Sequence, residues 1–177
     1  MTRMRVVLPA VIALGSNQGD REATLRDAVR DIAELDGVTV TAASGLFESA
    51  ALKLSGIDES APAYLNAVVL VRSALGPEEL LAALHEIEAK HGRVREEVWG
   101  DRTLDLDIVS FDSITKQTET ITLPHPRAWE RAFVLAPWLQ VEPDAVITGR
   151  GRVADLLAAA TDTAWPREGL PLLGGAR

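Results

Sequence analysis

Two aspartates separated by one residue, Asp105 and Asp107, are the side chains in this sequence best suited to chemistry. They belong to the segment TLDLDIV, whose alternation of polar and apolar residues predicts a β-strand over residues 103–111. Both carboxylates then share one face of the strand. Two such charges repel unless a cation or arginines lie between them, and Mg²⁺ prefers oxygen ligands. Taken alone, the pair is also compatible with the solvated face of an edge strand. The apolar residues that share the other face are Leu104, Leu106 and Ile108.

Three arginines precede the aspartates in the segment GRVREEVWGDR, namely Arg93, Arg95 and Arg102. A guanidinium group can donate two parallel hydrogen bonds to a phosphate. Carboxylates, metal ions and arginines together are typical of enzymes that transfer phosphoryl groups. Acidic residues also lie in this segment, so a salt-bridged surface loop is the alternative. The residues alone leave both interpretations open.

Aromatic, amide and imidazole side chains add a second group of candidates. Trp99 lies in the same polar segment, where it either caps the core or stacks on a planar ligand. Tyr64 and Asn66 share one face of a strand predicted over residues 63–73, and an amide suits the polar edge of a heterocycle. Taken alone, residues of these types are more often packing or edge-strand residues. Among the histidines, His125 lies between two prolines in a non-helical bend, so we expect it to be the functional one.

The elements that must position these residues follow a simple order. Strand and helix patterns alternate as strand, helix, strand, strand, helix, strand. This order predicts an α+β protein with a ferredoxin-like βαββαβ core, in which helices pack on one face of a mostly antiparallel sheet. The predicted elements are a strand ending at 11–14, a helix over 20–35, strands over 38–48 and 63–73, a helix over 76–92 and a strand over 103–111.

A C-terminal extension follows this core. We predict a short strand over residues 121–123, a segment that turns helical after His125, a last helix over 152–160 and an irregular tail from Trp165. No repeat or linker divides the chain, so we expect one domain over residues 1–177 with its core at about 11–160.

Composition excludes several classes of protein. Without cysteine, the chain has neither disulfides nor thiolate metal sites, which fits a reducing compartment. A net charge of −8 argues against general nucleic-acid binding. The basic and apolar N-terminus is similar to a signal peptide, but the turn GSNQGD that follows favours a first strand. No other stretch is apolar enough to span a membrane. We therefore expect a cytoplasmic monomer that binds neither nucleic acid nor membrane.

Five motifs resemble those of one enzyme family. ALGSNQGD, YLNAVV, GRVR, WGDRTLDLDI and LPHPRAWERAFVLAPW occur in the order found in the 6-hydroxymethyl-7,8-dihydropterin pyrophosphokinases of folate biosynthesis, over roughly Val11 to Pro143. The resemblance implies transfer of the diphosphoryl group of ATP to the hydroxymethyl group of 6-hydroxymethyl-7,8-dihydropterin, with release of AMP. The alternatives are a Mg²⁺-dependent phosphohydrolase and a non-catalytic pterin- or nucleotide-binding homologue.

The resemblance also implies roles for individual residues. By similarity, Asp105 and Asp107 hold two Mg²⁺ ions that bridge the triphosphate, and Arg93 and Arg102 are catalytic. The residues implied in ATP binding are Arg95, Arg102, Ile108, Thr122, His125 and Arg131. Those implied in pterin binding are Ser49, Leu52, Tyr64, Asn66, Trp99 and Phe133.

The chain departs from the family pattern near the pterin residues. Ala50 and Ala51 stand where a proline usually follows the position of Ser49, and a long acidic segment follows Leu52. Thr120 replaces an arginine often found near Thr122. These departures concern loop motion and ATP affinity, and they leave the reaction class unchanged.

Overall fold

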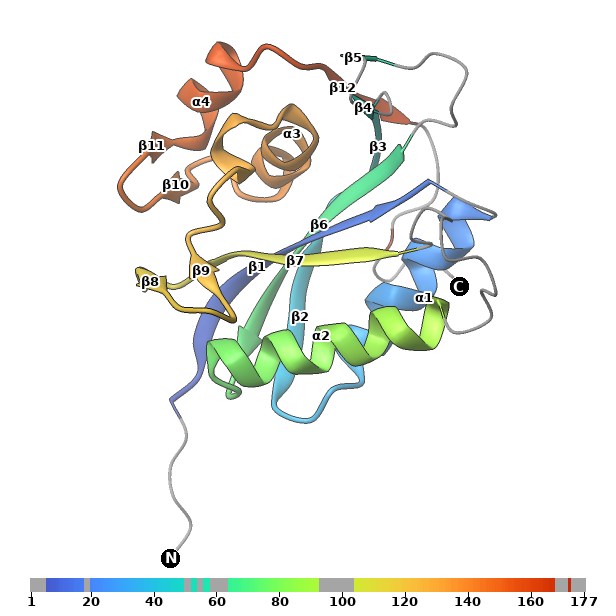
Figure 1. Ribbon diagram of the computed structural model, residues 1–177, viewed down its shortest axis with the longest axis vertical. Helices are drawn as coiled ribbons and strands as arrows, with labels where there is room; N and C mark the ends of the chain where they lie inside the picture. The colour runs from blue at the N-terminus through green and yellow to red at the C-terminus, as the bar shows by residue number, and fades with distance from the viewer. Residues whose placement is uncertain are drawn as a thin grey trace, which may run out of the picture.

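The structure, a computed structural model, describes residues 6–17, 20–49, 52–53, 56–57, 64–92, 104–167 and 172, with the backbone alone for 52–53 and 56–57 (Figure 1). The main sheet comprises β1 (Leu8–Ser16), β2 (Val38–Ala43), β3 (Leu46–Ser49), β6 (Tyr64–Ser73), β7 (Asp105–Phe111) and β12 (Ala164–Arg167). The helices are α1 (Arg21–Ala33), α2 (Pro77–Gly92), the 3-10 turn η1 (Ala128–Glu130), α3 (Ala132–Val141) and α4 (Val153–Ala159). Short two-stranded ribbons are formed by β4 (Leu52–Lys53) with β5 (Gly56–Ile57), β8 (Lys116–Gln117) with β9 (Thr122–Leu123), and β10 (Val146–Ile147) with β11 (Gly151–Arg152).

The strands of the main sheet lie in the order β12-β3-β6-β1-β7, and β2 also pairs with β6. All of these pairings are antiparallel. The chain runs through β1, α1, β2 and β3, β6, α2 and β7 in turn, which confirms the predicted ferredoxin-like arrangement. In the central strand β1, Gly15 lies opposite Asn66 of β6 on one side and opposite Asp105 of β7 on the other.

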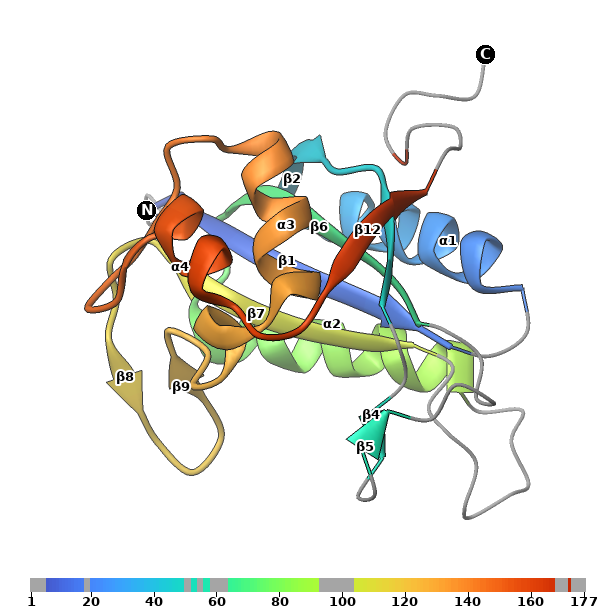
Figure 2. The ribbon, with the colours of Figure 1, turned by 90° about the horizontal axis from the view of Figure 1, so that it is seen from above.

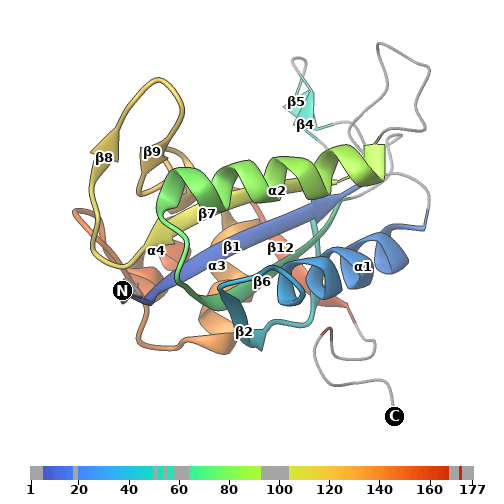
Figure 3. The ribbon, with the colours of Figure 1, turned by 90° about the horizontal axis from the view of Figure 1, so that it is seen from below.

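One face of the sheet is covered by α1 and α2 (Figure 3). α1 begins after Asp20, whose carboxylate accepts a hydrogen bond from the Ala23 amide at 3.1 Å and so satisfies one donor at the helix start. The buried residues of the two helices recur at helical spacing; they are Leu25, Ala28, Val29 and Ile32 in α1 and Leu80, Leu84 and Ile87 in α2. The apolar face predicted for β7 joins the same core and is confirmed by the burial of Leu104, Leu106 and Ile108.

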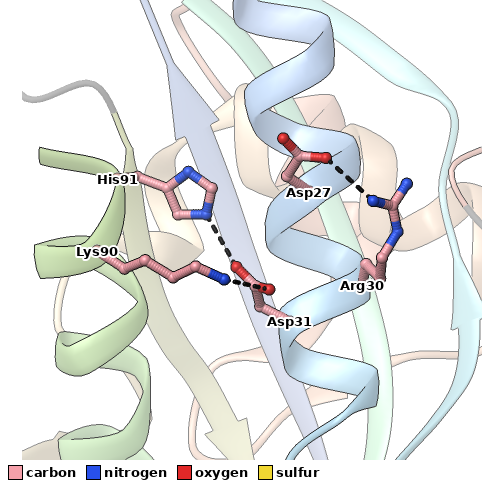
Figure 4. Close-up of polar contacts among 5 residues, drawn as sticks. All are labelled: Asp27, Arg30, Asp31, Lys90 and His91. Atoms are coloured by element: carbon pink, nitrogen blue, oxygen red, sulfur yellow. Dashed lines mark hydrogen bonds and ion pairs between the residues drawn. The ribbon is translucent and has the colours of Figure 1, made fainter.

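A charged cluster fastens α1 to the last turn of α2 (Figure 4). The carboxylate of Asp31 accepts a hydrogen bond from Lys90 Nζ at 3.0 Å, and its other oxygen lies 2.9 Å from His91 Nε2. Burial raises the pKa of Asp31, but the hydrogen bonds and charges of Lys90 and His91 outweigh burial and leave the pKa below its ordinary value of 3.8. The cluster therefore fixes the end of α2 next to Gly92, where this helix stops.

The core helices α1 and α2 share one face as predicted, and α3 of the C-terminal extension packs across the opposite face of the sheet (Figure 2). Val11, Val68 and Val109 point to this side and are buried in one cluster with Leu135 and Trp138 of α3. The central strands are thus apolar on both sides, and each side needs a covering layer. α4 packs against α3 and lies within the predicted range 152–160.

The strand predicted over residues 38–48 is divided into β2 and β3. At the break, the Gly45 amide donates a hydrogen bond to Gln140 Oε1 of α3 at 2.6 Å, and the Ser44 hydroxyl accepts one from the Val68 amide at 2.9 Å. These side-chain bonds replace part of the regular ladder, so the register on β6 shifts between the two strands.

The tail predicted to be irregular from Trp165 contains a strand, so this prediction is wrong for its first residues. β12 pairs with β3 at the edge of the sheet. Trp165 Nε1 donates a hydrogen bond to one oxygen of Glu48 at 3.1 Å, and Arg167 forms an ion pair with the other at 3.6 Å. Pro166 is tolerated here because an edge strand has one unpaired side. Within the described ranges, no helix combines the length and apolar character needed to cross a membrane.

Candidate functional site

A pocket of about 260 Å³ opens on the α3 face of the sheet. Its floor comes from β1, β6 and β7, and its wall from the segment that leads into α3 and from the first turn of that helix. Eight residues predicted for the site line it, although they lie as far apart in the sequence as Ser49 and Phe133. They are Ser49, Tyr64, Asn66, Asp105, Asp107, His125, Arg131 and Phe133.

The two carboxylates enter the pocket from β7. Asp105 is half-buried and Asp107 is exposed, and each is paired through the backbone with the central strand β1. The amide of Leu106, between them, donates a hydrogen bond to Glu88 Oε2 of α2 at 2.9 Å. β7 is the last strand of the sheet, so this bond occupies a donor on its outer edge and holds the strand between the two aspartates.

The donor set of the pocket suits a hard cation that is shared with an oxygen-rich ligand. Among the described residues, no group of three or more histidine, aspartate or glutamate side chains forms a complete metal site. Mg²⁺ usually takes one or two carboxylates from the protein and completes its shell with phosphate oxygens and water. Asp105 and Asp107 fit that pattern.

His125 is held in a defined tautomer opposite the carboxylates. Its backbone amide donates to the Val109 carbonyl of β7 at 2.9 Å, and its Nδ1 accepts from the Arg127 amide at 3.2 Å. Burial lowers the pKa of His125 below its ordinary value of 6.5, and the charges of Arg131 and Arg127 lower it further against the opposing effect of Asp107. The neutral ring therefore carries its proton on Nε2.

Arg131 and Phe133 flank the first residue of α3 and form the wall of the pocket. The guanidinium carbon of Arg131 lies 5.5 Å from the centroid of the Phe133 ring, within the range of a cation–π contact. The pair offers a positive charge beside a flat apolar surface. Such a wall suits a ligand that carries phosphate at one end and a planar ring at the other.

Asn66 presents one particular end of its amide to the pocket. Its NH₂ group donates to Ser49 Oγ at 2.7 Å and lies near the carbonyls of Tyr64 and Phe47 at 3.4 and 3.5 Å. Because those carbonyls accept only, the NH₂ group must face them, and Oδ1 lies on the side of Gly15. The carbonyls of Tyr64 and Phe47 thus orient the Asn66 amide so that it offers an acceptor, which suits a ligand with N–H donors.

Not every predicted residue is brought to the pocket. The side chain of Ile108 is buried on the helix face, so only its backbone is near the pocket strands. Thr122 lies in the β8–β9 ribbon and does not line the pocket. The side chain of Leu52 lies outside the described residues, and so do Arg93, Arg95, Trp99 and Arg102.

Six of the described lining residues were not predicted for the site, and Gly15 is the one that bears on the position of Asn66. Gly15 lies between Asn66 and Asp105 in the sheet, and a Cβ atom added there would stand 3.4 Å from Asn66 Oδ1. The absence of a side chain keeps the acceptor accessible. The available signal was a glycine at the end of an apolar strand, directly before a polar turn.

The sequence matches one family over most of its length. The model of the 7,8-dihydro-6-hydroxymethylpterin-pyrophosphokinase (HPPK) family matches residues 11–143. Relatives named 2-amino-4-hydroxy-6-hydroxymethyldihydropteridine pyrophosphokinase include one from Bacillus subtilis, 45% identical over 132 residues, which make up 75% of this chain and 77% of that protein. Another, from Synechocystis, is 36% identical over 159 residues, covering 89% of this chain and 79% of that one.

Solved structures show the same fold. Wild-type HPPK-DHPS of Plasmodium falciparum superimposes with a TM-score of 0.67 at 12% identity, covering 89% of this chain and 45% of that protein. The chain therefore spans less than half of the Plasmodium protein, while it spans most of the bacterial relatives.

Proposed function

The chain belongs to the 7,8-dihydro-6-hydroxymethylpterin-pyrophosphokinase family, and we propose that its pocket transfers the diphosphoryl group of ATP to the hydroxymethyl group of 6-hydroxymethyl-7,8-dihydropterin. The hydroxyl oxygen bonds to the β-phosphorus, the bond from that phosphorus to the α–β bridging oxygen breaks, and AMP leaves while the hydroxyl proton is released. The observation that carries the proposal is the gathering of carboxylate, imidazole, guanidinium, amide and phenyl groups in one pocket.

Asp105 and Asp107 are the proposed ligands of two Mg²⁺ ions that arrive with ATP. Bound there, Mg²⁺ supplies positive charge to the triphosphate and so lowers the cost of bringing an alcohol to the phosphorus. The protein contributes the fixed separation of the carboxylates along β7, maintained by the pairing to β1 and by the Glu88–Leu106 hydrogen bond. Carboxylates that are already positioned before the reaction increase the rate, because no free energy is needed to reorganise them in the transition state.

The nucleotide is proposed to bind along the wall formed by His125 and Arg131. The Nε2–H of a neutral His125 can donate to a phosphate oxygen, and the Arg131 guanidinium can donate two parallel hydrogen bonds. Thr122 and the backbone of Ile108 remain proposed contacts to the rest of the nucleotide. Ile108 is next to Val109, whose carbonyl accepts the hydrogen bond of the His125 amide, and Thr122 precedes His125 by three residues.

The pterin is proposed to bind between Asn66 and Phe133. The Asn66 carbonyl oxygen would accept hydrogen bonds from the N–H groups of the heterocycle, and the Phe133 ring would cover its face. Tyr64 and Ser49 would complete the polar side of the pocket, with Ser49 holding the Asn66 amide. Leu52 and Trp99 are proposed from the sequence to close over the ring.

Arg93 and Arg102 are proposed as the catalytic arginines and Arg95 as a further ligand of ATP. Their sequence positions, after the end of α2 and before β7, bracket the segment that joins the helix to the metal strand. Arginine in such a position can stabilise the charge that moves from the β-phosphorus to the leaving AMP. Cytoplasmic location and a monomeric state remain predictions, to be tested by cell fractionation and by light scattering.

The proposal is tested by following all products in one assay with ATP, Mg²⁺ and the hydroxymethyl pterin. AMP and the pterin diphosphate should appear in equal amounts, and AMP should not form when the pterin is left out. Release of inorganic phosphate without pterin would instead indicate a phosphohydrolase. Binding of both ligands without any product would indicate a non-catalytic homologue.

A further inference from the structure

Helix α3 begins at the wall of the pocket, and its first amide is satisfied from a distant part of the chain. The four amides at a helix start have no partner within the helix, and a side chain just before the helix usually supplies one. Here the residue in that position, Arg131, makes no capping bond. The Ala132 amide instead donates to Asp162, with 3.0 Å to Oδ1 and 3.0 Å to Oδ2.

Asp162 comes from the connection between α4 and β12, beyond the end of the family match at residue 143. Its carboxylate lies at the positive end of the α3 dipole, where a negative charge is favoured. Ala132 is 3% exposed, so water does not readily replace this partner. The bond therefore ties the C-terminal extension to the start of α3.

The amide held by Asp162 lies between two residues of the pocket wall. Arg131 precedes Ala132 and Phe133 follows it, and both side chains line the pocket. Fixing the backbone at Ala132 fixes the points from which the guanidinium group and the phenyl ring project. Displacements of about 1 Å in such groups can lower a rate by about a hundredfold, because the reacting atoms lose their alignment.

Asp162 is itself held firmly because the strand that follows it is anchored. β12 pairs with β3, starting with Ala164 opposite Ser49, and Trp165 donates a hydrogen bond to Glu48. Ser49 lines the pocket and accepts a hydrogen bond from Asn66. The segment 162–167 thus contacts both the α3 wall and the β3 side of the same pocket.

We propose that Asp162 is a positioning residue for the proposed transfer, which holds Arg131 and Phe133 in place by capping α3 from the C-terminal extension. The proposal rests on the function assigned to the pocket, and it adds a residue that does not touch either substrate. It predicts that the acceptor oxygen of Asp162 matters more than its charge.

Kinetics and nucleotide binding of Asp162→Ala and Asp162→Asn test the proposal. Asp162→Ala should lower kcat/KM for pterin-dependent AMP formation about tenfold or more and weaken binding of a nonhydrolysable ATP analogue. Asp162→Asn keeps an acceptor and is a good cap, so it should restore most of both quantities. Wild-type values in Asp162→Ala, or an Asn variant as impaired as the Ala variant, would overturn the proposal.

Two control variants separate positioning from general effects. Asp155→Ala removes an exposed carboxylate from α4 and should leave kcat/KM unchanged. Ile147→Val removes a methyl group from the core shared with α3, so it should lower stability while keeping kcat/KM near that of the wild type. A loss of kcat/KM in Ile147→Val as large as in Asp162→Ala would assign the effect to stability and overturn the proposal.

Failure of this inference is distinguishable from failure of the proposed function. A wild-type protein that forms no AMP with the pterin would refute the function. An active wild type with an equally active Asp162→Ala variant would refute only the role of Asp162. Should Asp162→Ala fail to fold, Asp162→Glu, which keeps the charge and moves the acceptor by one methylene, should show a reduced kcat/KM, and a wild-type value would overturn the proposal.

Discussion

The two faces of the main sheet carry different tasks, and β7 shows the difference within adjacent residues. On the α1–α2 face, Leu106 is 1% exposed and belongs to a closed apolar core. On the α3 face, Asp105 and Asp107 line an open pocket. α1 and α2 cover the α1–α2 face, whereas α3 covers the α3 face only in part. Because side chains alternate along β7, one side of the strand contributes to the core and the other side contributes to the pocket.

The largest effect on the pocket face is expected for Asp107→Asn. The change keeps the shape of the side chain and removes the charge needed by a metal ion, so turnover should fall by about a hundredfold or more. Because Asp107 is exposed, the free energy of unfolding should change by less than about 0.5 kcal/mol. Steady-state rates and urea unfolding provide the two measurements. Turnover near that of the wild type would contradict the metal assignment.

The opposite result is expected from the neighbouring residue on the helix face. Leu106→Ala should lower the free energy of unfolding by about 2–5 kcal/mol, because it leaves a cavity in a fully buried core. The folded fraction should keep most of its activity when assayed well below the melting temperature. The same two measurements apply. If Leu106→Ala abolished turnover without loss of stability, the separation of the two faces would be wrong.

An intermediate effect on turnover and stability is expected at Glu88, a residue of α2 that is hydrogen-bonded to the strand carrying the aspartates. Its carboxylate reaches from α2 to the Leu106 amide at 2.9 Å, between the two aspartates. Glu88→Ala leaves that amide without its acceptor and should cost about 1–3 kcal/mol of stability together with a loss of turnover. Glu88→Gln retains an acceptor and is the matched control. Equal effects of both variants would show that charge, and not the hydrogen bond, is what matters.

The smallest effect is expected at Asp31, far from the pocket on the helix face. Asp31→Asn should lower the free energy of unfolding by about 1 kcal/mol at neutral pH. The pKa of Asp31 is lower in the folded protein than its ordinary value of 3.8, so its contribution is complete above that value. The contribution is lost as the pH falls through the folded pKa. Urea unfolding at pH 7 and pH 3 should show a smaller difference between wild type and variant at pH 3. A difference that stayed constant or grew would contradict the assignment.

The difference between the faces was largely predictable from the sequence, because it depends on local alternation. The alternation of apolar and acidic residues in β7 predicts which residues face each side of the sheet. The helical spacing of apolar residues in α1 and α2 predicts that these helices cover the apolar side. The pocket members from β6 followed in the same way, since Tyr64 and Asn66 share a face of one strand.

What the sequence did not predict depends on contacts between distant segments. Helical periodicity shows that α3 has an apolar side but not which face of the sheet it will cover, so the second layer was missed. The bond from Trp165 to Glu48 joins residues 117 positions apart, and the bond from Ala132 to Asp162 joins residues 30 apart. No local sequence pattern predicts either contact, because each forms only when distant segments of the chain pack together.

The central claim, that the metal–nucleotide complex binds on the α3 face, is tested most directly by paramagnetic relaxation in solution. Mn²⁺ replaces Mg²⁺ together with a nonhydrolysable ATP analogue, and the broadening of backbone amide resonances of the ¹⁵N-labelled protein is recorded. Broadening should be greatest around Asp105, Asp107 and His125, weak along the outer surface of α1, and reduced near the pocket in Asp107→Asn. Broadening centred on α1 and α2, or equal in the wild type and the variant, would contradict the claim.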